Sequence, residues 1–200
     1  MTTIVAVRKA DQIVMGSDSL LTMGGTRMSH RYEPTQKIHV LGHSCIGFAG
    51  SVAHYPAVMR GLREIQDKEP EKFSLRSFDA VYDVFTRLHK KMKDELFLNP
   101  KKAPEDPYES SHFSLMIANG SGVYGVYGHR EIMQYQCFWA NGSGRPFALG
   151  AMHAVYEGAL DAASIAKTGL SAGMEFDPSS AGEQRIFIFT AGEDAPPRMA

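Results

Sequence analysis

The hydrophobic pattern at the start of the chain predicts a pair of strands that are buried on both faces. Residues 2–8 and 12–18 are rich in β-branched and apolar side chains at adjacent positions, and the polar run 9–11 between them is typical of a turn. A strand with one solvent-exposed face would alternate apolar and polar residues instead. We therefore expect this hairpin to lie inside a layered structure.

Further along the chain the pattern alternates between groups of strands and pairs of helices. Short apolar runs predict strands over residues 37–41, 44–50, 112–118, 122–127, 131–135, 148–150 and 185–190. Apolar side chains spaced three and four residues apart predict helices over residues 52–65, 78–96, 151–160 and about 162–173. The proline-rich, charged run 99–111 is expected to be a surface loop.

This order of elements indicates the fold class. Two sheets packed on each other, each covered by a layer of helices, would bury every apolar face in the pattern. We therefore expect an α+β fold, a four-layer αββα sandwich. The length of 200 residues and the hydrophobic content of 44% suit a single domain over residues 1–200.

Composition excludes several classes of partner. The 21 Lys and Arg residues nearly balance the 22 Asp and Glu residues, so the net charge of -1 gives no reason to expect a nucleic acid or a membrane surface. No apolar run approaches the roughly 18 residues that span a bilayer, and the N-terminus does not resemble a signal peptide. Two cysteines are too few for a disulfide framework, which favours a cytoplasmic location.

The sequence also predicts neither a metal nor a cofactor. His39 and His43 are four residues apart, but a strand and turn would not bring their rings onto one ion. The glycines of residues 120–125 match the dinucleotide-binding pattern, yet they lead into a strand, so no helix N-terminus would hold a pyrophosphate.

Thr2 is the first candidate for chemistry. Its side chain is small, so an aminopeptidase could remove Met1 and leave a residue with both a hydroxyl and a free α-amine. The pKa of an α-amine is about 7.7–8.0, so it could accept the hydroxyl proton through a water molecule and create a nucleophile. Taken alone, these residues are more simply the start of a strand, since threonine is common there, and other segments of the chain are needed to favour the catalytic interpretation.

Four segments near the N-terminus resemble the proteasome β-subunit family. They are Thr2-Thr-Ile-Val-Ala-Val-Arg8, Gly16-Ser-Asp18-Ser19, Lys37-Ile38 and Gly47-Phe-Ala-Gly50-Ser51. The first is most similar to the HslV peptidase branch, and the predicted order of elements agrees with the αββα sandwich of the family. Later segments differ from HslV, so the resemblance is to a divergent bacterial proteasome homologue.

The resemblance implies roles for residues in these segments. Thr2 matches the N-terminal nucleophile, and Asp18 matches the aspartate that forms a salt bridge with the catalytic lysine. Lys37 matches that lysine, displaced by an apparent insertion around residues 32–34. A lysine ammonium near the threonine would lower the pKa of its hydroxyl and amine. Gly50 matches the glycine whose backbone N–H stabilises the oxyanion.

Towards the C-terminus the match is partial. Asp177 and Ser180 resemble the Asp-x-x-Ser pair that orders the threonine amine. The family also has a Gly-Ser-Gly run before its third helix, and its serine touches the same amine. In the run Leu149-Gly150-Ala151-Met152, Ala151 is expected to stand in place of that serine, which would leave the hydroxyl missing.

The resemblance further implies a substrate and an assembly. The pocket for the side chain before the scissile bond matches Leu21, Phe48 and Val52, which predicts cleavage after hydrophobic residues. The expected protein is a threonine endopeptidase subunit of a proteolytic chamber, made of stacked homo-oligomeric rings of six or seven subunits and acting on unfolded polypeptide. An ATP-dependent unfoldase partner is implied by analogy.

Two other functional classes stay open. One is a non-catalytic ring or scaffold protein, which Ala151 would favour. The other is an N-terminal nucleophile amidohydrolase that acts on a small amide. Native mass would distinguish a ring from a monomeric amidase, and activity of a Thr2→Ala variant would distinguish an enzyme from a scaffold.

Overall fold

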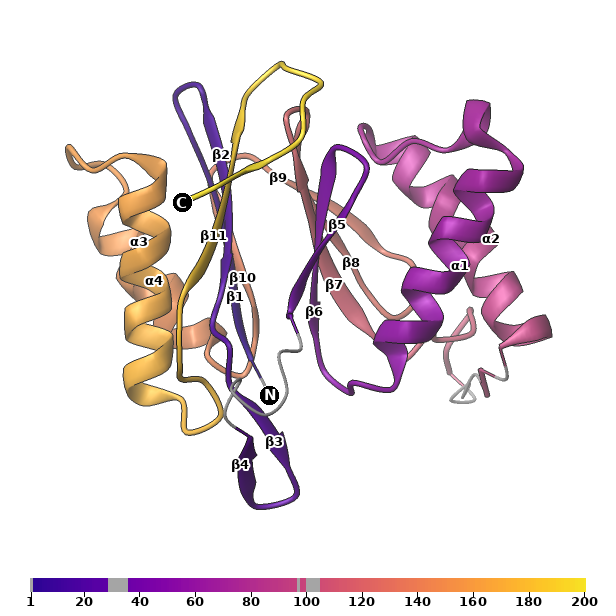
Figure 1. Ribbon diagram of the computed structural model, residues 1–200, viewed down its shortest axis with the longest axis horizontal. Coiled ribbons are helices and arrows are strands. Elements are labelled where there is room, and N and C mark those ends of the chain that lie inside the picture. The colour runs from indigo at the N-terminus through magenta and orange to yellow at the C-terminus, as the bar shows by residue number, and fades with distance from the viewer. Residues whose placement is uncertain (1, 29–35, 97, 100–104) are drawn as a thin grey trace.

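Two five-stranded antiparallel sheets pack face to face between two pairs of helices (Figure 1). The computed structural model describes residues 2–28, 36–96, 98–99 and 105–200. The apparent insertion at residues 32–34 and part of the predicted 99–111 loop lie outside the described residues. The four layers confirm the α+β, αββα architecture expected from the sequence.

The first sheet contains both ends of the described chain. Its strand order is β10 (Phe138–Gly142), β1 (Thr3–Lys9), β2 (Gln12–Ser17), β11 (Arg185–Thr190) and β12 (Arg198–Met199). Helices α3 (Arg145–Val155) and α4 (Ala162–Phe176) cover its outer face (Figure 1).

The second sheet is a meander. Its order is β5 (Ile38–Leu41), β6 (Ser44–Ala49), β7 (Ser114–Asn119), β8 (Gly122–Val126) and β9 (Ile132–Tyr135). Helices α1 (His54–Lys68) and α2 (Phe78–Glu95) cover its outer face, with a single 3₁₀ turn at Pro70–Lys72 between them. A small hairpin of β3 (Leu21–Met23) and β4 (Thr26–Met28) projects from the end of the molecule at which the N-terminus lies (Figure 1). Among the described helices, none has the length and apolar character needed to cross a bilayer.

Strand β1 shows why its sequence lacks alternation. Ile4 and Ala6 face the second sheet in the central core, whereas Val5 and Val7 face α3 and α4. All four side chains are completely buried. Burial on both faces removes the need for polar positions, so the prediction of a doubly covered strand is confirmed.

The region before α3 differs from the sequence prediction. Residues 148–150, predicted to form a strand, lie inside α3, which begins at Arg145. Pro146 occupies the first turn of this helix, where the missing N–H costs nothing. Ala148 and Met152, four residues apart, form the buried face that packs on the sheet. Strand β10 was not predicted, and it pairs with β1 from Thr3 opposite Gly142 to Val7 opposite Phe138.

Candidate active site

Thr2 directly precedes β1, an inner strand of the first sheet, at the end of the molecule where the N-terminus lies (Figure 1). Only 5% of its surface is exposed. The loop Gly142–Gly144 crosses directly over it, because a Cβ on Gly142 would overlap the Thr2 carbonyl and a Cβ on Gly144 would overlap the Thr3 hydroxyl. Glycine at both positions therefore allows the loop to reach the N-terminal residues of the strand.

Asp18 and Lys37 form a buried ion pair beside the start of β1. The Lys37 Nζ lies 2.7 and 2.8 Å from the two carboxylate oxygens of Asp18. The exposed fraction of the side chain is 4% for Lys37 and 0% for Asp18. The carboxylate also accepts hydrogen bonds from the backbone N–H groups of Thr3, Leu20 and Ala181. Asp18 thus ties together β1, the segment before β3 and the loop after α4.

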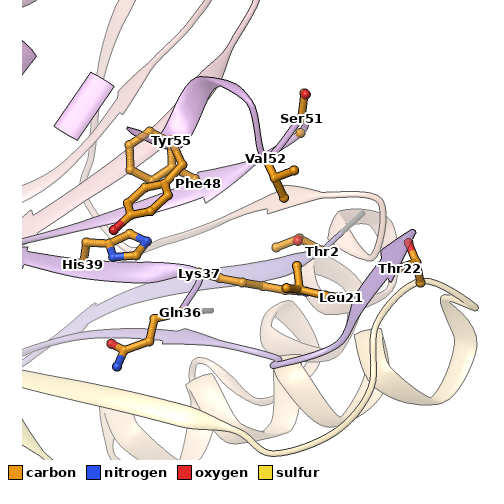
Figure 2. A pocket seen from close by; sticks show the side chains of 11 residues that line it. Thr2, Leu21, Thr22, Gln36, Lys37, His39, Phe48, Ser51, Val52 and Tyr55 are labelled. Atoms are coloured by element: carbon orange, nitrogen blue, oxygen red, sulfur yellow. The ribbon is translucent and has the colours of Figure 1, made fainter. Parts of the chain in front are cut away.

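The environment of Lys37 changes its proton affinity. Burial lowers the pKa of Lys37, because the charged ammonium loses solvent, and the attraction of Asp18 opposes part of this effect. The side chain lies just before β5 and reaches along the cavity that Thr2 also lines (Figure 2). The structure therefore brings the predicted nucleophile, aspartate and lysine to one place.

A second polar group surrounds the backbone nitrogen of Thr2. This N–H donates to Ser143 Oγ over 3.2 Å, and the Ser143 hydroxyl donates to Asp177 Oδ2 over 2.6 Å. The Ser180 hydroxyl donates to the same oxygen over 2.6 Å and lies 2.7 Å from Thr3 Oγ1. Burial alone would raise the pKa of Asp177, but these two hydroxyls and the Ser179 N–H outweigh it and lower the pKa.

Ser143 corrects the expectation about Ala151. Ala151 lies in α3, about 1.7 turns past its start, whereas the serine that reaches the Thr2 nitrogen belongs to the Gly142-Ser143-Gly144 run before the helix. The prediction that the hydroxyl is missing is therefore wrong. Because Pro146 is typical of a helix start, the sequence could have predicted that this run directly precedes the N-terminus of a helix.

A first cavity opens from Thr2 between β3, β5, β6 and the start of α1 (Figure 2). Its volume is about 250 Å³. The structure places all three predicted pocket residues in its wall, namely Leu21, Phe48 and Val52. Gly50 also lines it, at a φ of 125° that strains any residue with a side chain.

Two aromatic residues of this cavity were missed from the sequence. His39 and Tyr55 stack with their ring centroids 3.9 Å apart, next to Phe48 (Figure 2). Burial lowers the pKa of His39 to about 4, so the ring is neutral at neutral pH. The sequence pattern suggested only a test of His39 as a metal ligand. The structure places it on β5, with its side chain in the cavity wall.

A second cavity also borders Thr2. Its volume is about 350 Å³, and it is lined by Thr2, Ala49, Gly50, Ser114, Asn141, Gly142, Ser143 and Arg145. Thr2 and Gly50 are common to both cavities. The groups around Thr2 form the kind of set that nucleophilic acyl transfer uses, namely its own hydroxyl, its nitrogen held by Ser143, the Lys37 ammonium and the Gly50 N–H.

Comparison with known proteins agrees with this geometry. The family model described as "Proteasome subunit" matches residues 1–189. The proteasome subunit beta of Nanoarchaeum equitans is 25% identical over 95% of this chain and 93% of that protein. The ATP-dependent protease subunit HslV of Caldicellulosiruptor saccharolyticus is 28% identical over 84% and 87%.

Solved structures extend the comparison. Thiobacillus denitrificans BPH superimposes with a TM-score of 0.85 and 32% identity, covering 95% of this chain and 98% of that one. The same protein in complex with epoxomicin gives a TM-score of 0.84 and 30% identity over 96% and 100%. These matches confirm the resemblance to proteasome β subunits and HslV inferred from the sequence, and the chain belongs to the proteasome subunit family.

Proposed function

We propose that this protein is a threonine endopeptidase subunit whose nucleophile is Thr2, exposed after Met1 is removed. The observation that carries the proposal is the convergence on Thr2 of two separate groups. The Asp18–Lys37 ion pair lies beside it, since Lys37 lines the same cavity as Thr2 and Asp18 accepts from the Thr3 N–H. Ser143, held by Asp177, accepts a hydrogen bond from the Thr2 nitrogen. A residue at the start of an ordinary strand requires neither group.

The proposed reaction follows from these positions. The Thr2 Oγ1 attacks the carbonyl carbon of the substrate and gives its proton, through a water molecule, to the Thr2 α-amine. The Gly50 N–H stabilises the oxyanion. The C–N bond then breaks, the departing amine takes the proton, and an ester to Thr2 remains. Water hydrolyses this ester and regenerates the free hydroxyl.

Each remaining residue has a role in this scheme. Lys37 lowers the pKa of the nucleophile, and Asp18 holds Lys37 in position. Asp177 and Ser180 hold the strand end and the Ser143 hydroxyl. Ser143 accepts a hydrogen bond from the nitrogen that becomes the α-amine.

Intact-protein mass spectrometry with epoxomicin tests the proposal. The inhibitor's epoxyketone warhead needs both the hydroxyl and the free amine of an N-terminal threonine. We expect a mass that lacks Met1 and gains one inhibitor molecule. Retained Met1 would contradict the proposal in favour of a scaffold protein. A processed chain without an adduct would favour an amidohydrolase that acts on a small amide.

The corrected assignment of Ser143 gives a prediction of its own. Ser143→Ala should lower kcat by about 10²-fold, because the α-amine loses its link to Asp177. It should also shift the acid limb of the pH–rate profile to lower pH, since removal of a hydrogen-bond acceptor destabilises the protonated amine. Ala151→Ser is the matched control and should change neither quantity. A large gain in kcat from Ala151→Ser would restore the original assignment.

The first cavity predicts the residue before the scissile bond. Apart from Lys37, whose charge is paired with Asp18, its walls are apolar or neutral. Leucine or phenylalanine at this position should therefore raise kcat/KM about tenfold over glutamate or lysine. A panel of fluorogenic peptides that differ only at this residue measures the preference. Faster cleavage after an acidic or basic residue would contradict it.

We further propose that the chain assembles into stacked homo-oligomeric rings. Three apolar side chains of the α3–α4 layer are exposed and suit a contact with another copy, namely Phe147, Leu160 and Phe176. The rings of Phe147 and Phe176 lie 5.6 Å apart and form one patch. Sedimentation velocity would detect a ring, whereas a monomer would favour the small-amide hydrolase.

The substrate, the partner and the location of such a chamber are proposed by analogy. Unfolded polypeptide is the proposed substrate, and an ATP-dependent unfoldase is the proposed partner. The cytoplasm is the proposed location, which agrees with both cysteines being free thiols. Stimulation of casein hydrolysis by an added unfoldase from the same cell would test the partner.

A further inference from the structure

The second cavity next to Thr2 carries a charge that the proposed reaction does not use. It differs from the first cavity in its lining, which includes Ser114, Asn141 and Ser143 in place of aromatic and aliphatic side chains. Arg145 is the only charged residue among those that line it.

The position of Gly50 orients the substrate across Thr2. With the side chain before the scissile bond in the first cavity and the oxyanion on Gly50, the reacting carbon lies over Thr2. The portion of the peptide that leaves with the amine must then continue away from the first cavity. The second cavity shares Thr2 and Gly50 with the first cavity, and its other lining residues are different. The leaving part of the substrate would thus lie against Ser143 and Arg145.

The polar neighbours of Arg145 are already engaged with one another. Asn141 Nδ2 donates to Ser114 Oγ over 3.2 Å, and Asn141 Oδ1 accepts from the Gly142 N–H over 2.9 Å. Asp177, the carboxylate behind Ser143, accepts from two hydroxyls and a backbone N–H. Within the described ranges, no ion pair or hydrogen bond of Arg145 to any of these groups is present.

Arg145 is therefore an exposed cation beside the nucleophile with no counterion from the cavity wall. The first turn of α3, which begins at Arg145, contains no acidic residue. A guanidinium in this position favours a planar carboxylate that can accept two hydrogen bonds. A neutral or basic group there would leave the charge uncompensated.

We propose that Arg145 forms a subsite for a carboxylate on the leaving side of the substrate. This subsite rests on the proposed peptidase function and defines its substrates further. The carboxylate could be the side chain of Asp or Glu, or the C-terminus of a short leaving peptide. Both sources present a carboxylate to Arg145, and peptides that carry only one of the two distinguish them.

Matched peptides cleaved by the full protein test the subsite. All carry leucine before the scissile bond and differ in the two residues that follow, which are glutamine or glutamate, with a free or an amidated C-terminus. We expect glutamate to raise kcat/KM about fivefold over glutamine, mainly through KM, and about 0.5 M NaCl to reduce this ratio. A preference for the free terminus over the amide would identify the C-terminus as the carboxylate.

Substitutions assign the effect to Arg145. The acidic-to-neutral ratio should fall to about one in Arg145→Gln, invert in Arg145→Glu and persist in Arg145→Lys. Arg198→Gln, which removes an exposed arginine on β12, is the matched control and should keep the wild-type ratio. A ratio compares two substrates on one protein, so a partial loss of folding does not change it.

The outcomes separate the subsite from the function on which it rests. A wild-type protein that binds epoxomicin and cleaves every peptide with equal kcat/KM would overturn the subsite alone. A wild-type ratio that survives in Arg145→Gln would do the same. A wild-type protein that neither cleaves a peptide nor forms the adduct would overturn the peptidase function first.

Discussion

Thr2→Ala should reduce peptide hydrolysis by at least about 10³-fold, because it removes the proposed nucleophile while both cavities and the Asp18–Lys37 pair remain. Alanine is as small as threonine for the aminopeptidase, so Met1 should still be removed. The α-amine is then present without the hydroxyl. The variant therefore isolates the contribution of Oγ1.

Initial rates with a fluorogenic peptide and the mass after incubation with epoxomicin measure this effect. Thr26→Ala is the matched control, since Thr26 is an exposed threonine on β4 away from both cavities. Its rate and its adduct should equal those of the wild type. Thr2→Ser should keep partial activity because a hydroxyl is retained. Substantial hydrolysis by Thr2→Ala would show that Thr2 is not the nucleophile.

Lys37→Met should cause the second large effect, a loss of both stability and activity. It leaves the Asp18 carboxylate fully buried without its cation, and breaking a buried pair in this way costs about 3–5 kcal/mol. Three backbone N–H groups still bond to Asp18, which favours the lower end of this range. The ammonium proposed to lower the pKa of Thr2 is also lost, so kcat should fall about 10²-fold.

Urea unfolding and steady-state kinetics measure the two losses separately. The double variant Asp18→Asn/Lys37→Met removes both charges and should recover much of the stability but none of the activity. Lys90→Met is the matched control, because 81% of the Lys90 side chain is exposed on α2 and its loss should change neither quantity. An unchanged free energy of unfolding in Lys37→Met would contradict the proposed role of the pair.

The helices show how far local pattern predicts this fold. The apolar spacing predicted α1, α2 and α4 to within a few residues, and Pro56 lies in the first turn of α1. Such helices have one buried face, so apolar residues recur every three or four positions along their sequence. The first turn of α3 contains Arg145 and Pro146 and shows no clear apolar period, and residues 148–150 after it were interpreted as a strand. Without that helix start, the serine before it could not be assigned.

The candidate site shows the same division between near and distant residues. Thr2, Asp18 and Lys37 lie within one N-terminal stretch, where spacing within a familiar pattern carries the information. Ser143 lies 141 positions from Thr2 and reaches it only because β10 pairs with β1 and ends at Gly142. Pairing between strands so far apart depends on the packing of the whole sheet, which no local window contains.

The sequence alone thus determined the layered fold, its family and the candidate nucleophile with its ion pair. Their signals are local, since burial on both faces of β1 and the spacing from Thr2 to Asp18 can be read along the chain. The tertiary structure decided which serine meets the Thr2 nitrogen, that His39 lines the first cavity, and that Arg145 borders the second. These contacts join separate elements, and only the packing of the two sheets brings those elements within hydrogen-bonding distance.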